Sequence, residues 1–151
     1  MRRKDRQITD RDAIDSIIRR CSVCRLGMCD NGQPYIVPLS FGYDGRFLYV
    51  HAALDGRKVD ILKRNKRVCF EFDRLEEVTP ADQACNWSMK YESVIGFGEA
   101  EMLEDADSKT AALSCIMRQY SSTDWTFTGQ AVSSTSVYRI RIEEITGKAR
   151  C

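Results

Sequence analysis

Histidine and net charge are what this sequence has least of. Its one histidine, His51, argues against a zinc site, and no Ser-His-Asp or Cys-His nucleophile arrangement is visible around it. The 23 Lys and Arg residues nearly balance the 22 Asp and Glu residues, and the net charge of +1 gives no overall field to attract nucleic acid or an anionic membrane. We therefore expect no nucleic-acid partner.

Long apolar runs are also missing. No stretch approaches the roughly 18 apolar residues that span a bilayer, and none follows the basic start Met1-Arg2-Arg3-Lys4 as it would in a secretory signal. These features predict a cytoplasmic protein without a membrane partner. The 151 residues, 43% hydrophobic and 30% charged, fit a single globular domain over residues 1–151.

Cysteine, by contrast, is abundant, with seven residues in the chain. The spacing of Cys21, Cys24 and Cys29 could suggest a zinc site, but no second Cys or His pair stands at ligand spacing. The count is odd, and the cysteines are spread through patterned segments of a chain that shows no export signal. We interpret them as reduced thiols that pack as small apolar residues, and we expect no metal.

Hydrophobic periodicity predicts a mainly β chain with flanking helices. Apolar residues at helical spacing predict helices over residues 10–20, 57–65 and 105–120, and we expect residues 1–9 to form a loose arm. Alternation predicts six strands, over residues 23–30, 35–43, 46–52, 68–73, 89–103 and 137–145. Residues 74–86 and 121–134 are predicted to be loops.

Turn signals and glycines indicate how the strands are joined. Asn31-Gly32 and Asp44-Gly45 each fit a tight turn between antiparallel strands. Gly96 and Gly98 interrupt the longest predicted strand, where a bend or bulge would let it curve. Strands of this number and length with glycine bends favour a small closed barrel over an open sheet.

The most informative segment for function is His51-Ala52-Ala53-Leu54-Asp55-Gly56-Arg57-Lys58. A strand ends in two small residues, turns at Gly56 and enters a helix with two cations. The N–H groups at a helix start favour anions, and small residues let a ligand approach the backbone closely. Arg57 and Lys58 would add charge-assisted hydrogen bonds to a phosphate. From local chemistry alone, basic residues that simply face water remain the alternative.

This segment and the strands around it resemble the 5-nitroimidazole-resistance flavoproteins of the pyridoxamine 5′-phosphate oxidase-like superfamily. The similarity runs from about residue 10 to the C-terminus and rests on the order and spacing of four motifs: PYIVPLSFGY (34–43), FLYVHAALDGRK (47–58), VCFE (68–71) and YESVIGFG (91–98). The resemblance implies a six-stranded antiparallel split β-barrel of the FMN-binding type. It further implies a homodimer with one FMN at each of two interfacial sites, and FAD is the alternative flavin.

The resemblance also implies which residues hold the flavin. One chain would contact the ring and ribityl chain with Val37, Pro38, Leu39, Ser40, His51, Ala52 and Ala53. The same chain would hold the phosphate with Gly56, Arg57 and Lys58. The second subunit would contribute Trp87, Tyr91 and Ser93.

His51 is the candidate catalytic residue. It stands at a strand end before the proposed phosphate turn, and the resemblance implies a functional histidine at this position. An ordinary pKa near 6.5 would let it donate a proton while a bound molecule is reduced. The favoured hypothesis is an FMN-dependent oxidoreductase acting on a small molecule such as a nitroaromatic. Two alternatives stay open: a flavin-binding carrier or sensor without turnover, and a related barrel that uses haem or a deazaflavin.

Overall fold

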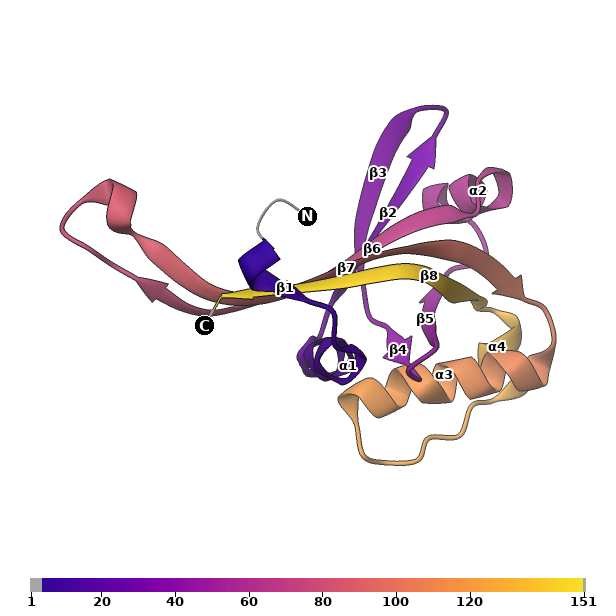
Figure 1. Ribbon diagram of the computed structural model, residues 1–151. Helices are drawn as coiled ribbons and strands as arrows, with labels where there is room; N and C mark the ends of the chain where they lie inside the picture. The colour runs from indigo at the N-terminus through magenta and orange to yellow at the C-terminus, as the bar shows by residue number, and fades with distance from the viewer. Residues whose placement is uncertain (1–3, 151) are drawn as a thin grey trace.

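Antiparallel strands dominate the computed structural model, which describes residues 4–150 of the chain (Figure 1). The strands are β1 (Gln7–Ile8), β2 (Cys24–Asp30), β3 (Gln33–Leu39), β4 (Gly42–Tyr43), β5 (Phe47–Ala52), β6 (Arg67–Thr79), β7 (Ser88–Leu103) and β8 (Ser136–Arg150). The helices are α1 (Arg11–Arg20), α2 (Arg57–Arg64), α3 (Ala106–Tyr120) and α4 (Gly129–Ser133). Two short 3-10 turns are η1 (Lys4–Arg6) and η2 (Ala84–Asn86).

The described strands form one sheet in the order β3-β2-β6-β7-β8-β5-β4, with β1 beside β8. All the pairings between them are antiparallel. The predicted fold class, a mainly β antiparallel split barrel with flanking helices, is confirmed. The sheet has eight strands rather than six, because β1 and β4 are only two residues long and show no alternation that a sequence could reveal.

The expectation of a loose N-terminal arm is corrected for the part that the structure describes. Gln7 pairs with Lys148 and Ile8 with Gly147, so β1 extends the sheet beside β8. Ile8 packs against the core, and a Cβ atom at Gly147 would lie only 3.0 Å from the Ile8 Cβ. Residues 1–3 of the predicted arm lie outside the described part of the chain.

The core fills the space between the inner face of the sheet and α1. Val68, Phe70 and Phe72 alternate along β6 with more exposed residues and are themselves buried. Phe72 meets Phe41 edge to face, with ring centroids 4.8 Å apart. Three buried isoleucines of α1 belong to the same cluster. The alternation predicted for this strand is therefore the alternation of buried and exposed side chains in the structure.

Helix α1 is capped and then tied to the barrel by polar contacts. The Asp10 carboxylate accepts a hydrogen bond from the Ala13 N–H at 2.8 Å, which confirms the predicted start of the helix. Further along, the buried Asp15 carboxylate accepts from the Tyr43 hydroxyl at 2.5 Å and from the Arg11 Nε at 2.9 Å. Burial and the hydrogen bond to Asp15 raise the pKa of Tyr43, so the phenol stays protonated as a donor.

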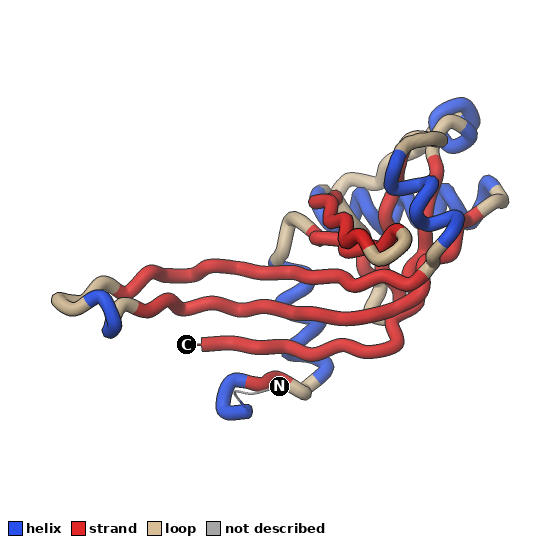
Figure 2. The backbone as a smooth tube through the Cα atoms, turned by 90° about the horizontal axis from the view of Figure 1, so that it is seen from above, coloured by secondary structure: helices blue, strands red, loops and turns tan. Residues whose placement is uncertain are grey.

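β6 and β7 form a long hairpin with η2 near its tip (Figures 1 and 2). β8 pairs with this hairpin as far as Tyr91, and only β6 and β7 continue beyond that point. The loop expected over residues 74–86 is therefore wrong in its first half, because β6 runs to Thr79 and pairs there with Ser88. The last five residues of β6 are all exposed, so this part of the sequence lacks the alternation of buried and exposed residues by which a strand is predicted. The loop expected over residues 121–134 likewise contains the short helix α4.

Gly96 and Gly98 lie where β7 curves, as expected. The pairing of β7 with β8 shifts register between Phe97 and Gly98. A Cβ atom at Gly96 would lie 2.2 Å from the Phe70 ring and 2.6 Å from the Glu144 carbonyl oxygen. Close packing against the core therefore requires a glycine at position 96.

We expect Gly96→Ala to lower the free energy of unfolding by about 1–3 kcal/mol, because the added methyl group must displace Phe70 or the β8 backbone. Urea unfolding followed by tryptophan fluorescence measures the change. Gly129→Ala is the matched control, since a Cβ atom there meets nothing within 4 Å and alanine favours the helix that begins at Gly129. Equal stability of Gly96→Ala and the wild type would contradict this explanation.

Candidate functional site

The start of α2 is arranged to receive an anion. Its N-cap, Gly56, has a φ of 123°, in the region of backbone conformation that favours glycine. No side chain within residues 4–150 caps this helix end, so the first N–H groups of α2 keep their donors for another partner. These donors lie at the N-terminus of α2, which is the positive end of the helix dipole and favours anions.

Arg57 and Lys58, the first two residues of α2, are each held by a contact with a strand. The Arg57 guanidinium lies over the ring of Tyr35 in β3, with Cζ 4.5 Å from the ring centroid. The Lys58 Nζ donates a hydrogen bond to the His51 carbonyl oxygen at 3.1 Å. A guanidinium has five N–H donors and an ammonium three, so both cations keep donors for a ligand. The contact with Tyr35 was not predicted from the sequence, where no spacing rule links β3 to α2.

His51 is the second-last residue of β5, close to this turn, with its main chain opposite Val137 of β8. The residue as a whole is exposed, yet protein atoms displace part of the water around its imidazole. This desolvation lowers the pKa of His51 below 6.5, and the positive charge of Lys58 lowers it further. The expected ordinary pKa is thus corrected. At neutral pH the imidazole is uncharged, with one nitrogen as donor and the other as acceptor.

β3 does not present residues 37–40 on one surface. Val37 and Leu39 pack against the core, whereas Pro38 and Ser40 between and after them are exposed. β3 is also the first strand of the sheet order, so within residues 4–150 its outer edge has no strand beside it. Pro38, Ser40 and unpaired main-chain groups of β3 are therefore accessible at this edge.

Trp87, Tyr91 and Ser93 lie on the long hairpin, away from His51. Tyr91 and Ser93 are residues of β7, and Trp87 follows η2, where its indole Nε1 donates to the Ala81 carbonyl oxygen at 2.8 Å. The hairpin tip and α2 lie at opposite ends of the molecule in both views (Figures 1 and 2). One chain therefore does not bring these three residues to the other predicted site residues. They would complete a site only in another copy of the chain.

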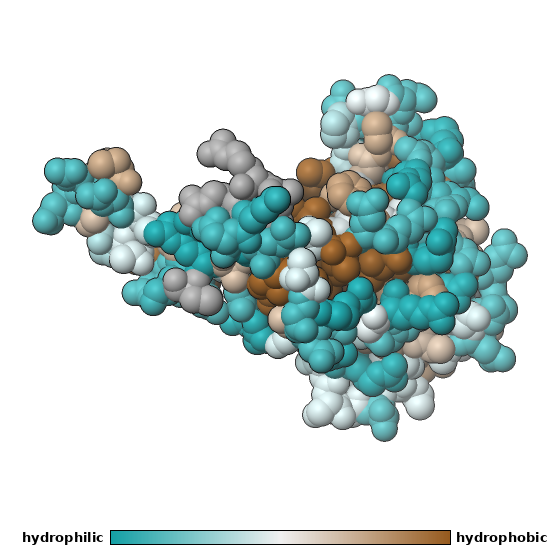
Figure 3. Space-filling model, in the orientation of Figure 1, coloured by the Kyte–Doolittle hydropathy of each residue, from teal (hydrophilic) through white to brown (hydrophobic). Residues whose placement is uncertain are grey.

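Large apolar side chains gather on the outer face of the sheet, which was not predicted. Ile95 and Phe97 of β7 are 45% and 44% exposed, and Ile36 of β3 is 65% exposed. Strand pairing places Gly27 between Ile36 and Cys69, and Cys69 beside Phe97, where a hollow of about 340 Å³ opens. We call these five residues the outer apolar face. Figure 3 shows apolar residues exposed over the sheet.

The sequence carried one signal for this face. Residues 35–39 are apolar at every position, and a strand without alternation is typical of burial on both sides. One side of β3 packs into the core, and the other has no partner within residues 4–150. A contiguous apolar patch of this kind, unlike a single exposed side chain, indicates an interaction surface.

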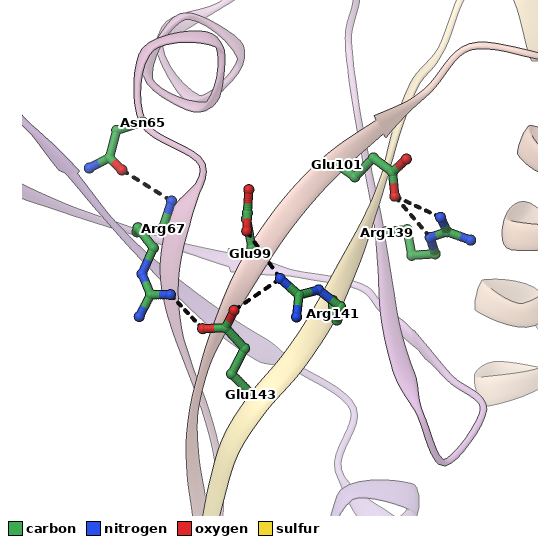
Figure 4. Close-up of polar contacts among 7 residues, drawn as sticks. All are labelled: Asn65, Arg67, Glu99, Glu101, Arg139, Arg141 and Glu143. Carbon is green, nitrogen blue, oxygen red and sulfur yellow. Dashed lines mark hydrogen bonds and ion pairs between the residues drawn. The ribbon is translucent and has the colours of Figure 1, made fainter.

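Glu99 and Glu101 follow Phe97 in the odd-numbered row of β7 and make the same side of the sheet charged. Figure 4 shows them with their ion-pair partners. The ion pairs that join β6, β7 and β8 there are Arg67–Glu143, Arg141–Glu143, Arg141–Glu99 and Arg139–Glu101. Their side chains are between 26% and 64% exposed, so water screens each pair and it adds little to stability. This charged region borders the apolar one and marks where the apolar surface ends.

The cysteines of the described chain are free thiols, six of them within residues 4–150. Burial raises the pKa of Cys21 to about 11 and that of Cys24 to about 12, so both stay protonated and weakly reactive. Within the same residues, no three His, Cys, Asp or Glu side chains are grouped as a metal site requires. None of the described helices has the length and apolar character needed to cross a membrane.

This fold and this arrangement of residues match a known family. The family model described as pyridoxamine 5′-phosphate oxidase matches residues 10–149, and the chain therefore belongs to this family. The resemblance inferred from the sequence motifs is confirmed at this level.

Solved structures give a closer comparison. The chain is similar to a candidate 5-nitroimidazole antibiotic resistance protein from Bacteroides thetaiotaomicron, with 35% identity, 95% of this chain and 86% of that chain covered, and a TM-score of 0.86. An FAD-binding protein from Mesorhizobium loti is 25% identical, with 97% and 98% of the two chains covered and a TM-score of 0.73. A flavocytochrome from Azotobacter vinelandii, 22% identical with 100% and 72% covered and a TM-score of 0.89, shares the fold.

One curated relative matches over a shorter segment. It is an uncharacterized protein of Rhizobium meliloti, 28% identical over 65 residues. The match spans 43% of this chain and 42% of that protein, less than half of either.

We expect the imidazole of His51 to titrate below pH 6.5, because desolvation and the Lys58 charge both disfavour the imidazolium. The chain has one histidine, so a tag-free sample shows a single Hε1 resonance to follow by NMR as pH is varied. Lys58→Gln should raise the midpoint toward 6.5, and Lys63→Gln at the far end of α2 should leave it unchanged. A wild-type midpoint at or above 6.5 would show that the environment of His51 is described wrongly.

Proposed function

We propose that this chain is a flavoprotein that binds FMN between two copies of itself and passes electrons from a donor to a small molecule. The observation that carries the proposal is the start of α2. There Gly56, Arg57 and Lys58 offer main-chain N–H groups and two cations together. Membership of the pyridoxamine 5′-phosphate oxidase family supports a phosphate-bearing cofactor at this place.

The donor set fits the phosphate of FMN. Helix N–H groups, a guanidinium and an ammonium are the donors that proteins use for phosphate oxygens. A Cβ atom at Gly56 would meet nothing within 4 Å, so a ligand has room beside the turn. Similarity to the FAD-binding protein from Mesorhizobium loti keeps FAD as the alternative flavin.

The neighbouring strands fit a flavin ring. An isoalloxazine needs an apolar surface and a few donors and acceptors at its polar edge. The free edge of β3 with Pro38 and Ser40 would supply both, and Ala52 and Ala53 are small enough to let the ring approach β5. When bound, the flavin supplies the electron-transfer chemistry, and these residues orient it and limit its contact with water.

We further propose that the electron acceptor is a small nitroaromatic. The support is the 35% identity to the candidate 5-nitroimidazole antibiotic resistance protein over 95% of this chain. His51 would contact the flavin or the substrate. Since its lowered pKa leaves the imidazole uncharged at neutral pH, it would orient a bound group by hydrogen bonding rather than act as an imidazolium acid.

A second copy of the chain is the proposed partner. The outer apolar face and the row of Tyr91 and Ser93 lie on the same side of β7, since all its odd-numbered residues there point outward. A dimer over this face would cover the apolar side chains and bring Trp87, Tyr91 and Ser93 to the other copy's flavin. Free thiols fit a reducing, cytoplasmic location.

The test is an FMN titration of the purified apo protein, with absorption and size-exclusion chromatography read together. We expect flavin absorption to co-elute with a species of dimer size. We expect Phe97→Lys to lose both dimer and flavin, because a charge on the outer apolar face would be buried unpaired in the interface. Flavin that a nicotinamide donor reduces and a nitroaromatic reoxidises would support the reductase, and bound flavin that does not cycle would favour a carrier.

Met102→Lys is the matched control for this experiment. Met102 is on the same strand and is 43% exposed, close to the 44% of Phe97, but it belongs to the even-numbered row of β7. It should leave both the dimer and flavin uptake intact. A wild-type protein that stays colourless with FMN would overturn the proposed cofactor, and a dimer that survives Phe97→Lys would overturn the proposed interface.

A further inference from the structure

Helix α2 is fastened to the β2–β3 hairpin at both of its ends, by contacts of different chemistry. At its C-terminal end, the Arg64 guanidinium donates to both carboxylate oxygens of Asp30 at 2.9 Å. The next residue, Asn65, donates through Nδ2 to the Cys29 carbonyl oxygen at 3.1 Å. At its start, Arg57 rests on the ring of Tyr35. The helix is thus held in place at both ends.

Arg64 and Arg57 differ in whether a carboxylate neutralises their charge. A carboxylate neutralises Arg64, so that contact is complete without a ligand. Arg57 is held by an uncharged ring, and among residues 4–150 no carboxylate pairs with it. A guanidinium that lies over an aromatic ring is attracted to the ring through its own flat face. The N–H groups of the guanidinium lie in its plane, so they stay free to donate hydrogen bonds. Arg57 therefore keeps its charge and its donors beside the start of α2.

We propose that Tyr35 is a positioning residue that holds Arg57 for the phosphate of the flavin, and that through Arg57 it makes the site prefer phosphorylated flavins to riboflavin. This inference rests on the proposed function. A free arginine side chain loses rotamer entropy when it is fixed. A side chain already fixed by Tyr35 loses less when the ligand binds, so the affinity for the phosphate rises.

Tyr35 is itself rigidly placed for this role. It lies in β3 opposite Met28 of β2 and packs against the core, half-buried. What acts on Arg57 is the face of the ring, so the hydroxyl group is not required. Phenylalanine at this position should therefore hold Arg57 as well as tyrosine does, whereas leucine should not.

The experiment measures dissociation constants for FMN and for riboflavin by flavin fluorescence, in the wild type and in variants. We expect Tyr35→Leu to weaken FMN binding roughly threefold to tenfold and to leave riboflavin binding unchanged. Tyr35→Phe should match the wild type for both ligands. In the Arg57→Ala background, Tyr35→Leu should cause no further loss, because the two residues act on the phosphate through one contact.

Arg64→Ala is the matched control, because it removes the ion pair with Asp30 that helps to hold the other end of α2 on the same hairpin. It should leave the ratio of the two affinities unchanged. If Tyr35→Leu weakens both ligands equally, or if Arg64→Ala changes the ratio as much, Tyr35 only fastens the helix and the inference is wrong. If the wild type binds no flavin, or binds FMN no more tightly than riboflavin, the proposed phosphate site itself is wrong.

Discussion

β7 is paired along both of its edges, to β6 from Ser88 to Glu99 and to β8 from Tyr91 to Leu103, and the rest of the structure depends on this double pairing. Side chains of a strand alternate, so a fully paired central strand gives the sheet two continuous faces. The inner face holds the core, where Gly96 leaves room for Phe70. The outer face carries Tyr91, Ser93, Ile95 and Phe97 in one row.

The site proposed here needs both faces of this arrangement. Pairing with β8 fixes β5, and so fixes where the turn from His51 into α2 begins. The outer face offers apolar surface to a second copy, and the hairpin extends far enough from the barrel to reach beyond its own chain (Figure 1). In the proposed dimer, one end of each chain would bind the phosphate and the hairpin would contact the partner, so neither end would complete the flavin site alone.

Local signals in the sequence predicted the parts of this structure that are built locally. The Asp10 cap, the apolar period of α1 and the turn at Gly56 each depend on a few neighbouring residues, and each lies where it was expected. The motif order then indicated the family and its barrel. The pairing of Gln7 and Ile8 with β8 escaped prediction, because the partner of a two-residue strand is set by tertiary contacts.

The other differences between the predictions and the structure also come from tertiary contacts. The outer half of β6 is exposed on both sides, so its strand comes from pairing with β7 rather than from a hydrophobic period. Desolvation lowers the pKa of His51 and the charge of Lys58 lowers it further, and both depend on α2 folding back toward β5, which no local pattern indicates. The contact of Arg57 with Tyr35 joins segments 22 residues apart and follows no local rule. Sequence reasoning proposed residues for the site, but it could not reveal the contacts that join them in the fold.

A complementation measurement tests directly whether two chains share the flavin site. One variant carries Arg57→Ala and Lys58→Ala, and the other carries Tyr91→Ala and Ser93→Ala. Each homodimer has two defective sites, but a heterodimer purified with two different tags has one site with both defects and one with none. The account predicts one FMN per heterodimer, bound with wild-type affinity. A heterodimer that binds FMN no better than the two homodimers would show that the residues do not meet across the interface.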